Sequence, residues 1–252
     1  MTRWLNCLLG WLAWCCLLPG AAWADPWPNP PPDHWYRQLV DIDFVRPYAV
    51  LPPRRDGVVI DARDTARRFE AGHLPGAISL PAKRFAELAT DRLPADKNQL
   101  IIFYCDGFEC ILSHLAADEA EDLGYRNIRV YPGGFPEWFR QGEVMALGAA
   151  HLQQRIAAGE IGRLLDLRDP GAYARAHLPG AVNLPAAELE SSTRAVLPAD
   201  KSTPLLIYGD ADDAGRCYAL ARQIHQLGYR RVMLLEGGFP AWQALGAAVA
   251  VP

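Results

Sequence analysis

Two cysteines, Cys105 and Cys110, are the side chains of this sequence most able to do covalent chemistry. Cys105 follows the apolar run 100–104 and precedes the segment 111–123, whose apolar residues have helical spacing. Loop amides and a helix N-terminus favour an anion, so the pKa of a thiol at such a junction should fall and its thiolate should be nucleophilic. Cys110 could then resolve a persulfide or a sulfenic acid on Cys105 through a disulfide, or it could simply fill space at the start of the helix.

The loop between the two cysteines would contact any substrate of Cys105. It consists of Asp106, Gly107, Phe108 and Glu109. Its two acidic side chains should repel an anionic substrate and oppose thiolate formation. Arg63 is a candidate anion-binding group near the same mouth, because it follows an earlier apolar run. Its alternative role, which we favour, is an ion pair with an acidic neighbour such as Glu70.

Cys105 lies in one half of an internal repeat. Five blocks of sequence recur in the same order. The first pair is offset by 105 residues and the other four by 104, so the two copies differ in length by one residue between the first and second blocks. The paired blocks are 61–64 with 166–169, 73–77 with 177–181, 93–97 with 197–201, 123–125 with 227–229, and 133–136 with 237–240. A repeat of this length indicates a tandem duplication of a whole domain.

Each copy alternates runs typical of strands and helices. Residues 58–60, 100–104 and 128–131 are short β-branched or apolar runs, as in buried parallel strands. The helix expected over 111–123 has its buried face at Leu112, Leu115, Ala116, Ala120 and Leu123. This alternation predicts an α/β fold of two tandem units, each a mainly parallel sheet covered by helices on both faces.

Taken together, the blocks resemble those of a known family. They read Asp61-x-Arg63, Glu70-x-Gly-His73-x-Pro-Gly-Ala77, Tyr104-Cys105, Leu123-Gly-Tyr125 and Gly133-Gly-Phe135 with Trp138. In this order they resemble the rhodanese (sulfurtransferase) family over both repeats. The resemblance implies that Cys105 accepts a sulfane sulfur from a small donor such as thiosulfate and passes it to a thiol acceptor, without a cofactor or a metal. Many rhodanese loops carry an arginine where this loop has Cys110, which argues against efficient use of thiosulfate.

The second unit lacks the nucleophile. Gly209 stands where the first unit has Cys105, and Cys217 aligns with Ser113 as a buried helix cysteine. The loop 209–215 contains three aspartates, but Ala221 occupies the position where a calcium-binding EF-hand loop needs a glutamate. We therefore expect a solvated acidic loop in a structural copy, or a copy that binds a protein partner.

Three further motif residues are expected in structural roles. His73 lies in a Pro-Gly turn motif, where a histidine is more often hydrogen-bonded than a proton carrier. Trp138 and Trp242 are expected in the cores of the two units.

The first 24 residues are typical of a secretory signal. Arg3 gives a positive start, residues 8–18 are apolar, and residues 22–24 match a small-x-small cleavage pattern. A retained membrane anchor is the weaker alternative. Cleavage would leave a protein of the periplasm or the extracellular space with no membrane segment. Its three remaining cysteines are an odd number for an oxidising compartment, so at least one should be free.

The rest of the chain divides into a proline-rich linker and two units. The linker is 25–34, the first unit is 35–147 with Cys105, and the second is 148–252. The formal net charge of -4 and the absence of a concentrated basic stretch argue against a nucleic-acid partner.

Three functions remain open on these grounds. The leading one is an exported sulfurtransferase that works through a persulfide on Cys105. The second is a thiol–disulfide or redox-sensing protein that uses Cys105 and Cys110. The third is a binding module without covalent chemistry.

Overall fold

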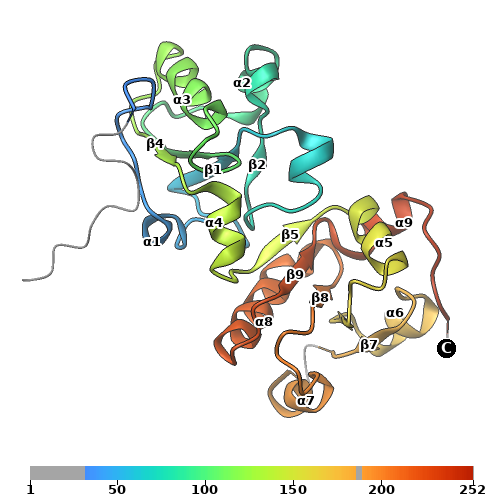
Figure 1. Cartoon of the computed structure of the whole chain (residues 1–252). Helices are drawn as coiled ribbons and strands as arrows, with labels where there is room; N and C mark the ends of the chain where they lie inside the picture. The colour runs from blue at the N-terminus through green and yellow to red at the C-terminus, as the bar shows by residue number, and fades with distance from the viewer. Residues whose placement is uncertain (1–31, 186–188, 252) are drawn as a thin grey trace, which may run out of the picture.

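The computed structural model describes residues 32–185 and 189–251, which form two α/β units (Figure 1). The expected signal, residues 1–24, and most of the expected linker lie outside these residues. Within the described residues, no helix has the length and apolar character needed to cross a membrane.

The first unit holds a four-stranded parallel sheet in the order β2-β1-β3-β4. Its elements are α1 (Ile42–Val45), β1 (Gly57–Asp61), the π-helix η1 (Thr65–Phe69), β2 (Ile78–Ser79), the 3-10 helix η2 (Ala82–Arg84), α2 (Phe85–Arg92), β3 (Leu100–Tyr104), α3 (Leu112–Asp122), β4 (Ile128–Tyr131) and α4 (Gly134–Arg140).

The second unit holds a five-stranded parallel sheet in the order β5-β9-β8-β6-β7. Its elements are β5 (Met145–Leu147), α5 (Ala149–Ala157), β6 (Arg163–Asp166), α6 (Pro170–Arg175), β7 (Ala181–Asn183), α7 (Leu189–Val196), β8 (Leu205–Tyr208), the 3-10 helix η4 (Ala211–Asp213), α8 (Ala214–Gln226), β9 (Val232–Leu235) and α9 (Gly238–Ala244). Because β5 pairs with β9, the sequence division at residue 148 falls after a strand of the second sheet rather than before it.

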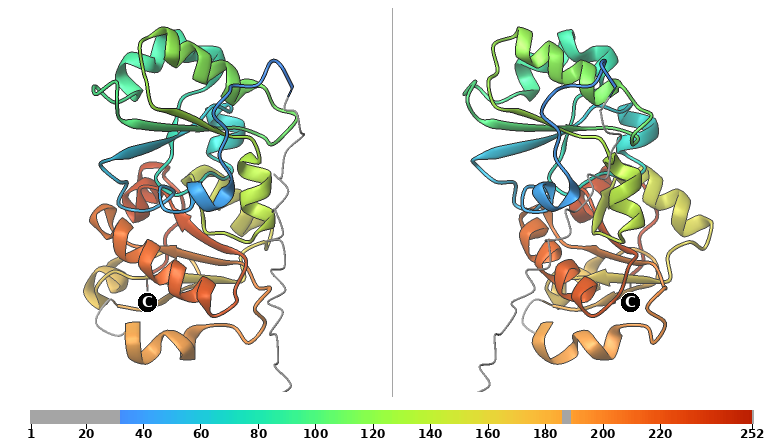
Figure 2. Two further views of the ribbon diagram at one scale, coloured as in Figure 1. Left: turned by 90° about the vertical axis from the view of Figure 1, so that its left-hand side faces the viewer. Right: turned by 60° about the vertical axis from the view of Figure 1, so that its left-hand side comes forward.

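Both faces of each sheet are buried, because alternate residues of a strand point to opposite faces. In β3, Ile101 and Phe103 pack with residues of α2 and α3, whereas Ile102 and Tyr104 pack with residues of α1, η1 and α4. Helices accordingly lie on both sides of the sheets (Figure 2). The predicted α/β fold of two helix-covered parallel sheets is confirmed. Leu115 and Leu123 are local exceptions, since they are 43% and 51% exposed although their helical spacing predicted burial.

The same hydrogen bonds recur in both units, which makes Cys105 and Gly209 structurally equivalent. The amide of Phe135 donates to the Cys105 carbonyl at 3.0 Å, and the amide of Phe239 donates to the Gly209 carbonyl at 2.8 Å. Each residue also directly follows the last residue of a central strand, β3 or β8. The core positions expected for Trp138 and Trp242 are confirmed, since each is 2% exposed, and these residues complete the repeat.

The one-residue difference between the repeats lies in η1. Asp64 and Asp169 each cap the helix that follows, with side chains that accept hydrogen bonds from Arg67 and Ala172 amides. Downstream, Phe69 and Tyr173 each stack on the histidine four residues later. The first unit fits one extra residue between these fixed points by winding a π-turn, a feature often found at functional sites.

Candidate functional site

Cys105 lies at the carboxyl end of β3, where ligands commonly bind in open α/β sheets. The five residues of β3 are fully buried between β1 and β4, and the chain leaves the sheet at Cys105. Gly107 then adopts a left-handed φ of 97° that turns the loop back toward α3. A Cβ atom at Gly134 would lie 2.2 Å from the Cys105 carbonyl oxygen. Gly134, in the Gly-Gly-Phe motif, therefore allows this loop to approach α4 closely.

The Cys105 sulfur is held inside the loop by two hydrogen bonds. Its S–H donates to the Cys110 carbonyl oxygen at 3.0 Å, which leaves the Ser113 hydroxyl, 3.2 Å away, to donate to the sulfur. Cys105 is only 1% exposed. Ser113 was not identified as a site residue from the sequence, where its alignment with Cys217 was its only distinguishing feature.

The two thiols differ in acidity, in the opposite sense to the sequence-based expectation. Burial raises the pKa of Cys105, and the hydroxyl and amide of Ser113 offset this rise only in part. The neighbouring Cys105 thiol, aided by the Asp106 and Leu112 amides, lowers the pKa of the half-buried Cys110 to about 6. In this closed loop Cys110 is therefore the more acidic of the two thiols, and the burial of Cys105 opposes the lowering of its pKa that the sequence led us to expect.

Arg63 is buried beneath the loop in a structural ion pair. Its guanidinium contacts the Asp61 carboxylate at 2.6 and 2.9 Å and donates to the Gly72 carbonyl oxygen at 2.7 Å. Glu70, the partner expected from the sequence, is not the one that it binds. Arg168 repeats the arrangement with Asp166 in the second unit. The remaining nitrogen of Arg63, Nη1, lies 3.4 Å from Asp106 at the base of the mouth.

A basic hollow of about 480 Å³ opens beside the Cys105 loop. Its charged lining residues are Arg63, Asp64, Arg67, Arg68, Lys83, Arg84 and Asp106. Asp106 is held between two arginines, because Arg68 Nε also lies 3.5 Å from its other oxygen. The expected repulsion of anions by Asp106 is therefore offset in the folded protein, and the hollow is suited to an anionic ligand.

Apart from Arg63, which lies between β1 and η1, the basic residues of this hollow come from η1 and η2, at a distance in sequence from Cys105. The dipeptides Arg67-Arg68 and Lys83-Arg84 were the available signal, but neither dipeptide adjoins Cys105 in the sequence. The matching hollow of the second unit, about 450 Å³, has the opposite balance of charge. Its charged lining residues are Arg168, Asp169, Asp210, Asp212, Asp213 and Arg216.

The other predicted loop residues do not line the basic hollow. Phe108 stacks on Trp35 from the segment before α1, with ring centroids 6.4 Å apart. Glu109 is exposed and Gly107 is buried. Of the predicted substrate-binding residues, the structure brings only Arg63 and Asp106 together at the hollow.

In the second unit, Asp213 occupies the space beside the lost nucleophile position. A Cβ atom at Gly209 would lie 2.5 Å from the Asp213 Cβ. Asp213 accepts a hydrogen bond from the Asp210 amide, pairs with Arg216, and is only 4% exposed. The expected solvated acidic loop is therefore wrong for Asp213, which is a buried capping residue. Within the described residues, no group of three or more potential ligands could hold a metal ion.

Comparisons with known proteins point in one direction. A model of the rhodanese-like domain matches residues 50–141 and again residues 148–245. A sulfurtransferase of Allochromatium vinosum is 31% identical over 109 residues, which cover 43% of this chain and 97% of that protein. The thiosulfate sulfurtransferase GlpE of Tolumonas auensis is 30% identical over 83 residues, which cover 32% of this chain and 71% of the relative.

Two other relatives are matched over a smaller part of their length. A transcriptional regulator of the HTH type from Mycobacterium tuberculosis is 38% identical over 74 residues, which cover 28% of this chain and 29% of the regulator. The crystal structure of a thiosulfate sulfurtransferase from Pseudomonas aeruginosa aligns with 85% of this chain and 43% of its own, at 22% identity and a TM-score of 0.37.

Proposed function

The chain belongs to the rhodanese-like family, and from this membership we propose that it moves sulfane sulfur through a persulfide on Cys105. The observation that carries the proposal is the position of Cys105 at the end of β3, next to a hydroxyl donor and a basic hollow. The equivalent position in the second unit has no nucleophile. Only the first unit can therefore carry this chemistry at the family position.

The reaction has two balanced steps. The Cys105 thiolate attacks the outer sulfur of an anionic donor such as thiosulfate, so a sulfur–sulfur bond forms at Cys105 and sulfite leaves with the electron pair of the broken bond. A thiol acceptor, as its thiolate, then attacks the outer sulfur of the persulfide and releases the Cys105 thiolate. The Ser113 hydroxyl is positioned to stabilise that thiolate.

The basic hollow supports an anionic donor. Five basic and two acidic side chains line it, and excess positive charge raises the local concentration of anions. The 1% exposure of Cys105 means that the loop 106–110 must shift before a donor reaches the sulfur. The donor would then pass from the hollow to Cys105 across Asp106.

A second candidate function is a reversible thiol–disulfide couple. It is favoured by the lowered pKa of Cys110, which the neighbouring Cys105 thiol causes. In this chemistry the Cys110 thiolate attacks the inner sulfur of a Cys105 persulfide, hydrosulfide leaves, and a Cys105–Cys110 disulfide forms. An external dithiol would then reduce the disulfide to two thiols.

Export and partner choice belong to the same proposal. The signal-like residues 1–24 support export to the periplasm or the extracellular space. The partners would then be a small sulfur donor and a thiol acceptor, with the second unit available to a protein partner. N-terminal sequencing of the protein from the periplasmic fraction should begin at Asp25; recovery of the uncleaved chain in membranes would argue for an anchor instead.

Intact-mass analysis of the purified protein before and after thiosulfate tests the main proposal. A gain of one sulfur atom, absent in Cys105→Ser and reversed by a small thiol, is the expected result. A loss of two hydrogens would point to the disulfide couple. An unchanged mass with every sulfur donor would leave a binding module and contradict the proposed transfer.

A further inference from the structure

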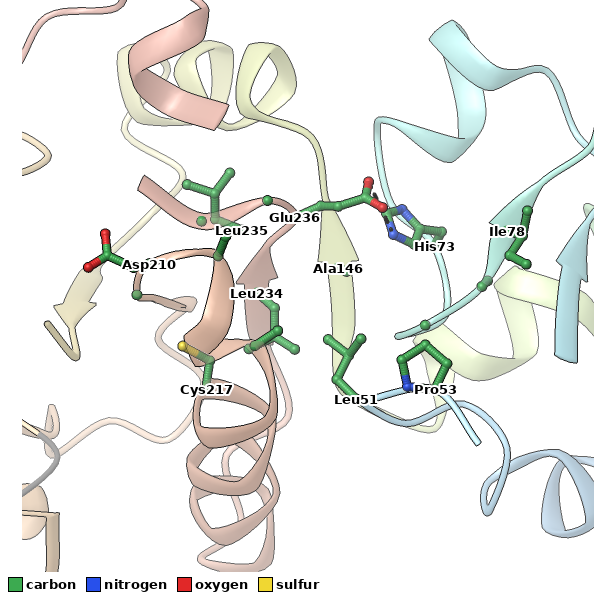
Figure 3. A pocket seen from close by; sticks show the side chains of 17 residues that line it. Leu51, Pro53, His73, Ile78, Ala146, Asp210, Cys217, Leu234, Leu235 and Glu236 are labelled. Atoms are coloured by element: carbon green, nitrogen blue, oxygen red, sulfur yellow. Dashed lines mark ion pairs between the residues drawn. The ribbon is translucent and has the colours of Figure 1, made fainter. Parts of the chain in front are cut away.

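A second pocket, of about 260 Å³, lies between the two units and away from Cys105 (Figure 3). Leu51, Pro53 and Ile78 line it from the first unit, and Gly209, Leu234 and Glu236 from the second. Gly209 and Glu236 directly follow β8 and β9. The pocket therefore occupies the carboxyl edge of the second sheet, where open α/β sheets bind ligands, although the nucleophile of that edge is lost.

Two hydrogen-bond acceptors face each other in this pocket. His73 Nδ1 lies 2.9 Å from the Phe69 carbonyl oxygen, so Nδ1 must carry the proton that joins them. Burial lowers the pKa of His73 to about 4, so the neutral ring presents an unprotonated Nε2 to the pocket. That nitrogen lies 3.6 Å from Glu236 Oε2, and Figure 3 shows the carboxylate directed at the ring. Among the described residues, no hydrogen bond reaches either of these two atoms, so a donor placed beside them could bond both.

The surroundings provide no cation for Glu236. The lining of the pocket contains no lysine or arginine, and no hydrogen bond from the described residues reaches this carboxylate. Although 46% of the Glu236 side chain remains accessible, the protein packed around it and the nearby Glu70 raise its pKa to about 7. The rest of the pocket wall is largely aliphatic, with Leu51, Ile78 and Leu234 among its side chains.

We propose that this pocket binds a small organic cation, a primary ammonium group on a short aliphatic chain. The ammonium donates one hydrogen bond to Glu236 Oε2 and another to His73 Nε2, because an ammonium group has three donors and both atoms are acceptors. The aliphatic chain lies against Leu51, Ile78 and Leu234.

The repeat provides an internal comparison. His177 has the same backbone contact as His73, with Nδ1 3.0 Å from the Tyr173 carbonyl oxygen, but among the described residues no carboxylate pairs with it. The facing pair thus exists only where the two units meet, since His73 comes from the first unit and Glu236 from the second. His73 and Ala146 already connect the two units through a pair of backbone hydrogen bonds, and the cation would add a further link at the same point.

Binding of three probes of similar length tests the proposal without reference to sulfur chemistry. Butylammonium, butanol and butyrate share an aliphatic chain and differ in charge. Titration of the full-length protein, followed by calorimetry and by the NMR signals of the His73 ring, should show saturable binding of butylammonium at least tenfold tighter than that of the other two. Equal or tighter binding of butanol or butyrate, or no binding of butylammonium, would overturn the proposal.

Two variants separate the pocket from the bulk surface. Glu236→Gln removes the charge and places an amide donor beside His73, so it should weaken butylammonium binding at least tenfold. Glu160→Gln, a surface carboxylate outside the lining, should leave binding unchanged. Equal losses in both variants would show general attraction of cations and refute the site. Sulfur transfer by Glu236→Gln should be unaffected, so failure here is distinct from failure of the proposed transferase activity.

Discussion

The hydroxyl of Ser113 lies 3.2 Å from the sulfur of Cys105. This contact joins the first turn of α3 to the end of β3. Both residues are buried, and the corresponding positions of the second unit hold Cys217 and Gly209. The second unit therefore has neither the nucleophile nor the hydroxyl that would support it. The absence of both residues from the second unit agrees with the proposal that only the first unit transfers sulfur.

Replacement of Cys105 should abolish sulfur transfer, because it removes the atom that forms the persulfide. Cys105→Ser should show no detectable thiosulfate:thiol transfer, whereas Cys217→Ser should keep the activity of the parent protein. Steady-state assays and intact mass report the two effects. Cys217 is the matched control, since it is also buried but lies in the unit without the nucleophile. Persistent transfer by Cys105→Ser would remove our assignment of the site.

Cys110 should be the first thiol to react with a small alkylating reagent. Its pKa is lowered to about 6, so its thiolate fraction, and with it the rate of reaction with iodoacetamide, should rise through pH 6 and level off above pH 7. Cys217, whose burial raises its pKa to about 12, should stay unmodified. Cys105→Ala removes the neighbouring thiol that lowers the Cys110 pKa, so the midpoint for Cys110 should move to higher pH. A midpoint near that of a free thiol, about 8.5, in the parent protein would contradict this order.

Charge reversal in the basic hollow should weaken the use of an anionic donor. Lys83→Glu combined with Arg67→Glu should lower kcat/KM for thiosulfate by about tenfold at low salt, because the hollow loses its excess positive charge. The difference from the parent should shrink as ionic strength rises. Arg92→Glu, an exposed residue outside the hollow, serves as the control. If the control variant loses as much activity as the double variant, the hollow has no specific role.

Arg63 should matter for stability in the same way as its counterpart in the second unit. Arg63→Ala leaves the buried Asp61 carboxylate without its main partner, which should cost about 3–5 kcal/mol of unfolding free energy. Arg168→Ala should cost a similar amount, because Asp166 is equally buried. Denaturant unfolding measures both. A stable Arg63→Ala protein with a raised KM would instead assign Arg63 to substrate binding.

Restoring a cysteine to the second unit should fail unless Asp213 is also changed. A side chain at Gly209 collides with the Asp213 Cβ, so Gly209→Cys should destabilise the protein by about 1–3 kcal/mol and acquire no persulfide. The double variant Gly209→Cys with Asp213→Ala should recover part of that stability. Unfolding midpoints and intact mass after thiosulfate report both outcomes. Full stability of the single variant would show that Asp213 does not block the position.

The sign of the charge around Cys105 could not be derived from its sequence neighbours alone. Asp106 adjoins Cys105 and Glu109 adjoins Cys110 in the loop, which predicts an acidic mouth. In the folded protein Asp106 lies between Arg63 and Arg68, while Glu109 stays in solvent. The sign of the local charge therefore depended on arginines about 40 positions earlier in the chain.

The sequence by itself determined the duplication, the α/β class, and the position of Cys105 after a central strand. These features depend on the spacing of apolar residues and on glycine motifs along the chain, which can be read without knowing how the elements pack. It also located the one-residue difference that the structure resolves as η1, although not its π-helical form. The tertiary structure alone decided the roles of Ser113, Arg68 and Lys83 and the facing of His73 and Glu236. Those contacts join residues from separate elements, and only the packing of one element on another sets which side chains meet.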